Sequence, residues 1–257
     1  GLDANSQCWF GSDPSIAQVY VLTKDQVLHT TELSRPKPPH GRSIVDRSLR
    51  TGDAGIPPEF DWSGSDNLRD VQITWPAPKV FDQGGVNSIG YAREVILPLT
   101  ITPRRPGAPV SLDASIDLGV CSDICLPQTI HLRALLDTRD SKPTPAIAAA
   151  FAARPYSGAE AGLKSAQCSL RPTARGLEIE TRLALPSAGG KETVVIEPGN
   201  PNMWMSEMDS QRSGNTLVAS GEMIAENGTA LALDRSAIRI TVIGKNHAVE
   251  ITGCTSG

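Results

Sequence analysis

Residues 110–118 read Val-Ser-Leu-Asp-Ala-Ser-Ile-Asp-Leu, and this stretch decides the fold class. Every second residue is apolar and the residues between are Ser or Asp, which is the period of a β-strand with one buried and one hydrated face. The same period recurs between turn-rich segments at residues 71–75, 95–101, 130–134, 177–183 and 238–251, the last interrupted by the turn residues Gly-Lys-Asn. The sequence therefore predicts an all-β protein.

Length and composition favour two domains. The chain has 257 residues, of which 39% are hydrophobic, and its 23 Gly and 20 Pro indicate many short elements joined by turns. Between residues 139 and 166 the alternation gives way to Pro, Ala and Ser, in a composition that supports a short helix. We therefore predict β-sandwich domains at 1–138 and 167–257, joined by a Pro/Ala-rich, partly helical linker at 139–166.

Two local expectations accompany this organisation. Proline lacks a backbone N–H and is mostly confined to edge strands, so Pro98 predicts that its strand lies at a sheet edge. Residues 1–50 mix Pro, basic residues and Ser without a sustained period, and no strand is predicted there.

Charge and composition exclude several classes of protein. The net charge is −4, from 24 basic and 28 acidic residues scattered along the chain, which disfavours a nucleic-acid partner. No stretch reaches the roughly 20 apolar residues of a membrane-spanning helix, and residues 1–20 lack the pattern of a signal peptide. Five cysteines are typical of an oxidising compartment. We expect a soluble, exported chain whose signal peptide has been removed.

The pair Cys121 and Cys125 lies in Leu-Gly-Val-Cys-Ser-Asp-Ile-Cys-Leu-Pro, directly after the clearest strand and before the next. Such a turn can bring two Cα atoms within the roughly 4.4 to 6.8 Å that a disulfide requires. A short disulfide on a turn is more readily reduced than one that clamps a sandwich, which favours exchange chemistry. Because cysteine spacing does not fix reactivity, a purely structural bond has equal weight on this evidence.

The length of the loop that each disulfide would close distinguishes this pair from Cys168 and Cys254. The chain-entropy model gives the short loop roughly 2 kcal/mol of stabilisation and the long loop roughly 4.5 kcal/mol. We therefore assign Cys168 and Cys254 a structural disulfide, with Cys168 before the first strand of the second domain and Cys254 after its last. Cys8 has no evident mate and receives no catalytic role.

Other residues near the turn are weaker candidates. Asp123 lies between the two cysteines, and a carboxylate there disfavours the thiolate. Phe81 and Tyr91, with Trp62 and Trp75, are candidates for an aromatic rim around the turn, although aromatic residues in strands more often belong to the core. The four histidines, His29, His40, His131 and His247, stand at no ligand spacing from the cysteines, so no metal or other cofactor is predicted.

Several runs resemble a known family. They are Ile-Pro-Pro-Glu-Phe-Asp-Trp-Ser-Gly-Ser at 56–65, Trp-Pro-Ala-Pro at 75–78, Val-Ile-Leu-Pro at 95–98, the cysteine turn at 117–127, and the runs at 192–199 and 232–237. Together they resemble the periplasmic N-terminal region of DsbD-type protein-disulfide reductases, most closely the branch with two such β domains that includes the ScsB proteins associated with copper tolerance. The resemblance covers about residues 52–257, and the cysteine turn is its most specific part.

The resemblance implies immunoglobulin-like domains and a periplasmic thiol-disulfide relay without a small-molecule cofactor. The pair would receive electrons from a membrane-embedded reductase domain and pass them to thioredoxin-like or disulfide isomerase-like proteins. Cys125, the cysteine nearer Pro127, would form the mixed disulfide and Cys121 would resolve it. The spacing of three residues is shorter than in the best-known DsbD domain. Two alternatives remain: a non-catalytic module that docks an envelope protein through a sandwich edge or the 201–214 loop, and Cu(I) binding by the thiol pair.

Overall fold

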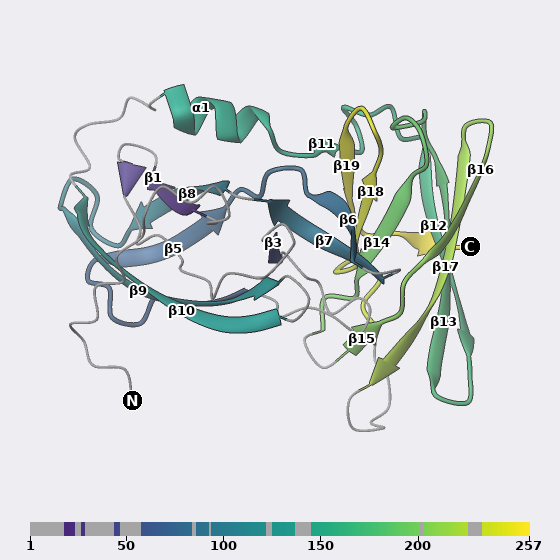
Figure 1. Ribbon diagram of the computed structural model, residues 1–257, viewed down its shortest axis with the longest axis horizontal. Coiled ribbons are helices and arrows are strands. Elements are labelled where there is room, and N and C mark those ends of the chain that lie inside the picture. The colour runs from purple at the N-terminus through teal and green to yellow at the C-terminus, as the bar shows by residue number, and fades with distance from the viewer. Residues whose placement is uncertain are drawn as a thin grey trace. The chain divides into compact units, whose positions relative to one another are not determined.

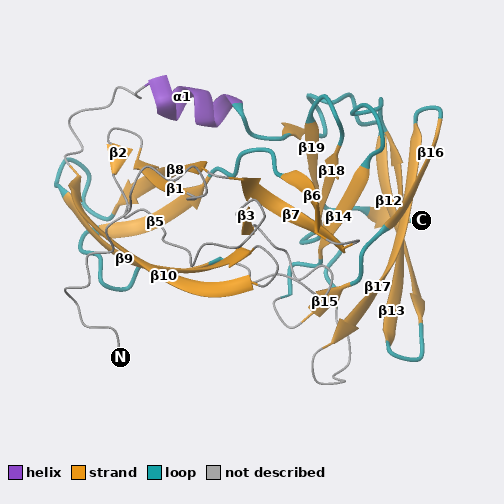
Figure 2. Ribbon diagram, in the orientation of Figure 1, coloured by secondary structure: helices purple, strands orange, loops and turns teal. Residues whose placement is uncertain are grey.

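The computed structural model describes residues 18–23, 27–28, 44–46, 58–83, 86–92, 94–121, 125–136, 145–200, 203–225 and 233–257. Within these residues the protein is built from β-strands and one short helix (Figures 1 and 2). The prediction of an all-β protein is confirmed.

The elements divide between two compact units, the first made from residues 1–47, 56–76 and 90–154 and the second from 48–55, 77–89 and 155–257. The first unit holds β1 (Gln18–Thr23), β2 (Val27–Leu28), β3 (Ile44–Asp46), β4 (Glu59–Asp61), β5 (Leu68–Ile73), β8 (Glu94–Pro103), β9 (Val110–Cys121), β10 (Cys125–Leu136) and α1 (Pro145–Ala152). The strand β7 (Val86–Ala92) is divided between the units after Ile89.

The second unit holds β6 (Lys79–Gln83), β11 (Tyr156–Ser157), β12 (Ser165–Pro172), β13 (Gly176–Ala184), β14 (Thr193–Glu197), β15 (Met203–Met205), β16 (Asp209–Ser213), β17 (Thr216–Ala225), β18 (Arg239–Ile243), β19 (Ala248–Thr252) and β20 (Thr255–Ser256).

The first unit is a sandwich. One of its sheets has the order β2-β1-β8-β5. The other has the order β10-β9-β3-β7 with β4 paired to β9, and the next strand in its order, β6, is assigned to the second unit. The alternation predicted for residues 110–118 is confirmed, because the apolar residues of that run are at most 3% exposed. They join one core cluster, which comprises Tyr91, Val95, Leu97, Leu99, Val110, Leu112, Ala114, Ile116, Leu118, Ile130, Leu132 and Leu136.

The prediction that Pro98 marks an edge strand is wrong. Its strand β8 lies between β1 and β5, and Pro98 pairs with Leu22 in the parallel ladder with β1. The carbonyl of Pro98 accepts a hydrogen bond from the N–H of Thr74, just after β5 ends. Because the N and C=O of one strand residue face the same neighbour, the missing N–H also faces the end of β5. The proline therefore leaves the ladder with β1 intact.

The first 50 residues contribute β1, β2 and β3, none of which was predicted. The strand β1 pairs in parallel with β8 over its whole length, and β3 pairs with both β7 and β9. These strands are short. β2 pairs only with the neighbouring β1, whereas β1 and β3 also pair with strands distant in sequence, which a local period does not predict.

The second unit is also a sandwich, with sheet orders β11-β19-β18-β14 and β15-β17-β13-β12-β20 and with β16 paired to β17. The hairpin predicted at 238–251 is confirmed as β18 and β19, which pair from Arg239 opposite Thr252 to Ile243 opposite Ala248. Gly244 begins its turn, and a Cβ there would lie 2.3 Å from the carbonyl oxygen of Ala188, so a larger residue does not fit without a backbone shift.

The helix expected within residues 139–166 is confirmed as α1. Its Ile147 and Ala150 are buried, and the helix packs beside β8 in the first unit. In the part of the chain that the structure describes, no helix combines the length and the apolar character needed to cross a bilayer.

Candidate functional site

The hairpin of β9 and β10 positions the cysteine pair. Its antiparallel ladder runs without a register shift from Val110 opposite Leu136 to Cys121 opposite Cys125. Direct partners in an antiparallel ladder have Cα atoms about 4.5 to 5.5 Å apart, which lies inside the range that disulfides span. The backbone therefore sets residues 121 and 125 directly opposite each other, as the last pair of the ladder.

The two faces of this hairpin differ in polarity. The even-numbered residues of 110–118 point into the core, whereas Asp113 forms an ion pair of 2.9 Å with Arg133, and Asp117 accepts a hydrogen bond from the hydroxyl of Thr129. Each of these pairs is also a ladder pair. By the period of two, positions 121 and 125 fall in the same alternation as this polar row.

The strands that carry the two cysteines have different neighbours. Cys121 lies opposite Cys125 on one side and opposite Ile44 of β3 on the other. Within the described residues, β10 pairs with β9 and stands at the end of its sheet. An edge strand leaves one row of backbone N–H and C=O groups without ladder partners, so position 125 has a more open backbone environment than position 121.

Two candidate neighbours are placed differently. Pro127 is exposed and lies opposite Gly119, two ladder positions from the cysteine pair. Asp123 belongs to residues 122–124, and it lies outside the described residues, as does Cys8.

Three of the aromatic candidates form a series of ring contacts with Phe60 at the first core, two of them stacked and the one between Phe60 and Trp75 edge-on. The ring centroids of Trp75 and Tyr91 are 6.2 Å apart, those of Phe60 and Trp75 are 6.1 Å apart, and those of Phe60 and Trp62 are 5.7 Å apart. Tyr91 is 7% exposed, and its hydroxyl donates a hydrogen bond of 2.7 Å to the carbonyl of Pro76. Phe60 was not among the predicted candidates, although its size and its position in a strand indicate a core residue.

Phe81 does not take part in that series, because it lies in β6, within the second unit. Tyr91, Trp62 and Trp75 thus lie together in the first unit, whereas Phe81 belongs to the second unit.

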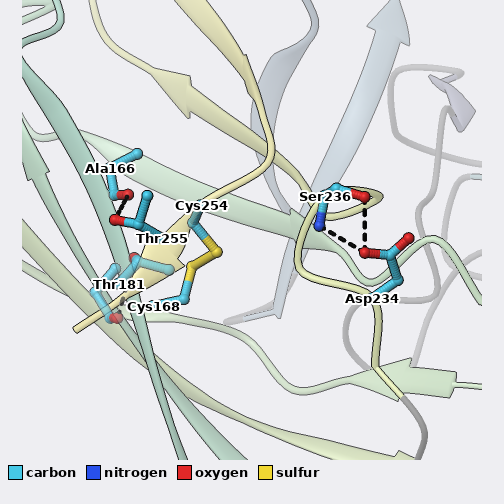
Figure 3. The surroundings of a disulfide bond; sticks show 8 residues. Ala166, Cys168, Thr181, Asp234, Ser236, Cys254 and Thr255 are labelled. Carbon is cyan, nitrogen blue, oxygen red and sulfur yellow. Dashed lines mark hydrogen bonds between the residues drawn. A yellow bond between two sulfur atoms is a disulfide. The ribbon is translucent and has the colours of Figure 1, made fainter.

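Cys168 and Cys254 are joined by a disulfide whose Cα atoms are 5.7 Å apart and 86 positions apart in sequence (Figure 3). Cys168 is completely buried. Its expected position before the first strand is wrong, because it lies within β12, and β20 follows Cys254. The short β20 returns to pair in parallel with β12, where the hydroxyl of Thr255 donates to the carbonyl of Ala166. The bond therefore ties the last strand of the unit to β12.

Over the residues that the structure describes, no three His, Cys, Asp or Glu side chains converge as ligands for a metal ion. The described histidines are His131, on the outward face of β10, and His247, whose ring lies 5.1 Å from that of Tyr156. The other two, His29 and His40, lie outside the described residues.

Residues 54–137 match the family model described as "Thiol:disulfide interchange protein DsbD, N-terminal". This segment belongs to the DsbD N-terminal family. The DsbD N-terminal segment contains the whole hairpin of β9 and β10, including both of its cysteines. The resemblance noted from the sequence is thus confirmed, and the family match covers this segment of the chain.

The fold of the chain is similar to a solved structure, "Crystal structure of the N-terminal periplasmic domain of ScsB from Proteus mirabilis". The TM-score is 0.64 at 19% sequence identity, and the match covers 93% of this chain and 92% of that chain. The prediction of immunoglobulin-like β-sandwich domains is confirmed by this likeness and by the sheets described above. No curated protein matches the chain.

Proposed function

We propose that this chain is a periplasmic thiol-disulfide interchange module that relays electrons through Cys121 and Cys125. The observation that supports the proposal most strongly is the register of β9 and β10, which sets these two residues directly opposite each other at the end of a long hairpin. Their backbone is thereby ready to form a disulfide, and the DsbD N-terminal match covers both residues.

The exchange requires no cofactor other than the two sulfur atoms. The thiolate of one cysteine attacks a partner disulfide, forms a mixed disulfide and releases one partner sulfur as a thiolate, which takes up a proton. The second cysteine then attacks the mixed disulfide. The partner leaves as a dithiol, and the pair becomes a disulfide, so that two electrons have passed to the partner.

We assign the first attack to Cys125 and the resolving step to Cys121. The different backbone environments support this order, because β10 is the edge strand of its sheet in the described residues whereas Cys121 lies between β10 and β3. A mixed disulfide requires that a second protein approach the attacking sulfur, which favours the cysteine of the edge strand.

The proposal includes the place and partners of the reaction. We propose residues 1–138 as the redox domain, 139–166 as a linker and 167–257 as a second sandwich domain. Electrons would come from a membrane-embedded reductase domain and pass to periplasmic thioredoxin-like or disulfide isomerase-like proteins. The similar ScsB structure is described as a periplasmic domain, which supports this location.

Single-cysteine variants test the proposal. With Cys121→Ala, the remaining Cys125 should form a stable mixed disulfide with a thioredoxin-fold protein supplied in its oxidised form, detected as a covalent adduct on a non-reducing gel. Cys125→Ala, which keeps only the resolving cysteine, should give much less adduct. The matched control is the double variant Cys121→Ala/Cys125→Ala, which should give none.

A second measurement separates the relay from a structural bond. We expect the Cys121/Cys125 pair, equilibrated in a glutathione buffer, to have a reduction potential above about −300 mV. Disulfides with potentials below about −300 mV are inert to glutathione. A lower potential together with no adduct from either single variant would favour the non-catalytic module.

A further inference from the structure

The strand β10 lies at the end of its sheet, on the side of β9 away from β3 (Figure 1). Among the strands that the structure describes, β10 pairs with β9 alone. Their ladder continues over all 12 residues of β10 without a register shift. A regular strand at the end of a sheet presents one row of backbone N–H and C=O groups to an incoming strand. The hydrogen bonds of β9 determine which residues form this row.

The backbone of β9 alternates between its two neighbours. Ser111 donates its N–H to the carbonyl of Asp66 at 3.2 Å, and its carbonyl accepts the N–H of Asp66 at 2.9 Å. Two residues further on, the N–H of Asp113 donates to the hydroxyl of Ser65 at 3.0 Å, and that hydroxyl donates to the carbonyl of Asp113 at 2.9 Å. Because β10 occupies the other side of β9, and because successive strand residues turn their backbone groups to opposite sides, the odd-numbered residues of β9 bond away from β10.

The same alternation identifies the open row of β10. Two residues directly opposite in an antiparallel ladder exchange both of their hydrogen bonds or neither. Even-numbered residues of β9 lie opposite even-numbered residues of β10, as Leu118 does with Gln128, and these pairs form the ladder bonds. The odd-numbered residues of β10 therefore turn their N–H and C=O groups to the free side. We call the backbone row formed by four of them the β10 edge: Thr129, His131, Arg133 and Leu135.

The start of the strand agrees with this assignment. Pro127 has no N–H, and its odd number puts its nitrogen on the free side, where no ladder bond is lost. Its carbonyl accepts a hydrogen bond of 2.8 Å from the side-chain amide of Gln128, as expected for a carbonyl outside the ladder. The side chain at the far end of the row, Leu135, is 69% exposed. Within the described residues, the β10 edge is thus open to a second polypeptide.

The β10 edge lacks the usual protection against strand pairing. Edge strands are commonly blunted by Lys, by Pro or by a β-bulge. Residues 128–136 read Gln-Thr-Ile-His-Leu-Arg-Ala-Leu-Leu and contain neither Lys nor Pro, and their ladder has no bulge. This strand is therefore suited to the mode of recognition in which an extended peptide adds to the edge of a sheet.

Charge distinguishes the possible occupants of the β10 edge. Two copies of the chain, paired about the middle of the row, would place Arg133 of one copy opposite Arg133 or His131 of the other. Like charges directly opposite are unfavourable, whereas an acidic residue opposite an arginine is favourable. Arg133 forms an ion pair of 2.9 Å with Asp113, yet its side chain remains 81% exposed. A foreign segment with an acidic residue at that position therefore fits better than a second copy.

We propose that the β10 edge binds an extended segment of the polypeptide whose disulfide exchanges with the Cys121/Cys125 pair, as an added antiparallel strand. This inference rests on the proposed function. The strand begins at Cys125, about 14 Å from Thr129 at about 3.4 Å per residue. In an antiparallel arrangement the partner's cysteine therefore follows the paired segment in sequence. Backbone groups supply most of the recognition, so that many sequences bind, with a preference for Asp or Glu opposite Arg133.

An 11-residue peptide with one cysteine, at its C-terminus, tests the proposal as a mixed disulfide with thionitrobenzoate. With its cysteine opposite Cys125, antiparallel pairing sets its positions 3, 5 and 7 opposite Arg133, His131 and Thr129. The thiolate of Cys125 attacks the peptide sulfur, and thionitrobenzoate leaves as a coloured thiolate. Cys121 then attacks the mixed disulfide, the peptide leaves as a thiolate, and the pair becomes a disulfide. The readout is the second-order rate of thionitrobenzoate release by the reduced full chain.

N-methylation of the peptide tests the backbone pairing without any change to the protein. Methyl groups on the nitrogens of positions 5 and 7 remove N–H groups that face β10, and they should lower the rate about tenfold. The matched control carries the methyl groups at positions 4 and 6, whose N–H groups face away from β10. It should react like the unmodified peptide.

The charge preference is tested by a pair of variants. A peptide with Glu at position 3 should react about threefold faster than one with Lys there, because this position lies opposite Arg133. Arg133→Glu should reverse the order. The matched control is Arg175→Glu, which changes another exposed, ion-paired arginine, in the second unit, and should leave the order unchanged.

Four outcomes would overturn the inference. Equal rates for the two methylated peptides, with exchange still proceeding, would refute strand addition and leave the proposed function standing. A faster rate for a peptide with its cysteine at the N-terminus would refute the antiparallel arrangement. A dimer of the full chain that His131→Pro dissociates would assign the β10 edge to a second copy. Release no faster than in Cys121→Ala/Cys125→Ala, which retains Cys8, would refute the proposed function and the inference with it.

Discussion

Replacing Cys168 and Cys254 together with Ala should lower the free energy of unfolding by about 4.6 kcal/mol at 25 °C. The two cysteines are 86 positions apart, and the chain-entropy relation gives a loop of that length about 15 cal/mol/K of lost denatured-state entropy. Their Cα atoms are 5.7 Å apart, near the usual separation in disulfides, so the bond fits the backbone positions of β12 and the segment before β20.

The assay is equilibrium unfolding in urea, followed by tryptophan fluorescence and by far-UV circular dichroism, with Cys121→Ala/Cys125→Ala as the comparison variant. The Cys121/Cys125 disulfide would close a loop of only five residues. If that disulfide forms, removing it should lower the free energy of unfolding by only about 2 kcal/mol. Both double variants keep the same number of remaining cysteines, so differences in aggregation through free thiols are limited.

The same variants separate structure from exchange. In the Cys168→Ala/Cys254→Ala variant, the Cys121/Cys125 pair should reach the same ratio of disulfide to dithiol in a glutathione buffer as in the wild-type protein. The ratio must be measured below the unfolding transition of the variant. A loss of stability under about 1 kcal/mol would refute the reasoning from loop length. Failure of partner exchange in a folded Cys168→Ala/Cys254→Ala variant would refute the assignment of this bond to a structural role.

Three other predictions follow from single side chains. Arg212→Met should cost about 3 to 5 kcal/mol in urea unfolding, because it leaves the carboxylate of Glu192, 2% exposed, buried without its cation. Asn67→Ala should cost about 2 to 4 kcal/mol in the same assay, because Asn67 has a φ of 59° and its buried amide bonds the 105–109 loop. Hydrogen bonds from the hydroxyl and then the N–H of Ser236 lower the pKa of Asp234 below its ordinary value of 3.8, so Ser236→Ala should raise that pKa in an NMR titration. Asp234 thus stabilises the fold above pH 3.8, and this contribution is lost as the pH falls through its folded pKa.

Each of these has a control. Arg175→Met removes a cation that is 72% exposed from Glu222 and should lower the free energy of unfolding much less than Arg212→Met, so equal losses in the two variants would contradict the argument from burial. The Asn67→Gly variant can adopt the positive φ but lacks the side-chain amide. If its free energy of unfolding equals that of the wild-type protein, the hydrogen bonds to the loop contribute nothing to stability. For Asp234, an unchanged pKa in Ser236→Ala would contradict the assigned cause.

Local patterns predicted the elements whose signal lies within one segment. The alternation at 110–118 predicted β9 because each of its apolar residues faces the same core. The Gly-Lys-Asn turn also predicted the hairpin of β18 and β19 from residues close in sequence. A glycine is required at its first position because Gly244 closely approaches Ala188. The short helix α1 followed from composition between two prolines.

The errors arose where a distant partner decides the structure. Pro98 occupies an interior strand because β5 ends beside it, which no local pattern records. Cys168 lies inside β12 because residues 165–172 pair along their whole length with β13. The strands β1 and β3 form on partners far along the chain.

The sequence by itself determined the all-β class, the hairpin that carries the cysteine turn, and the family resemblance, because each depends on residue types at short spacing. Only the tertiary structure decided that Cys121 lies between Cys125 and Ile44, and that β7 belongs to both units. The physical reason is that ladder pairing and apolar cover join residues that are distant in sequence. Their free energy depends on which surfaces meet, and the pattern within any one segment does not specify its partner.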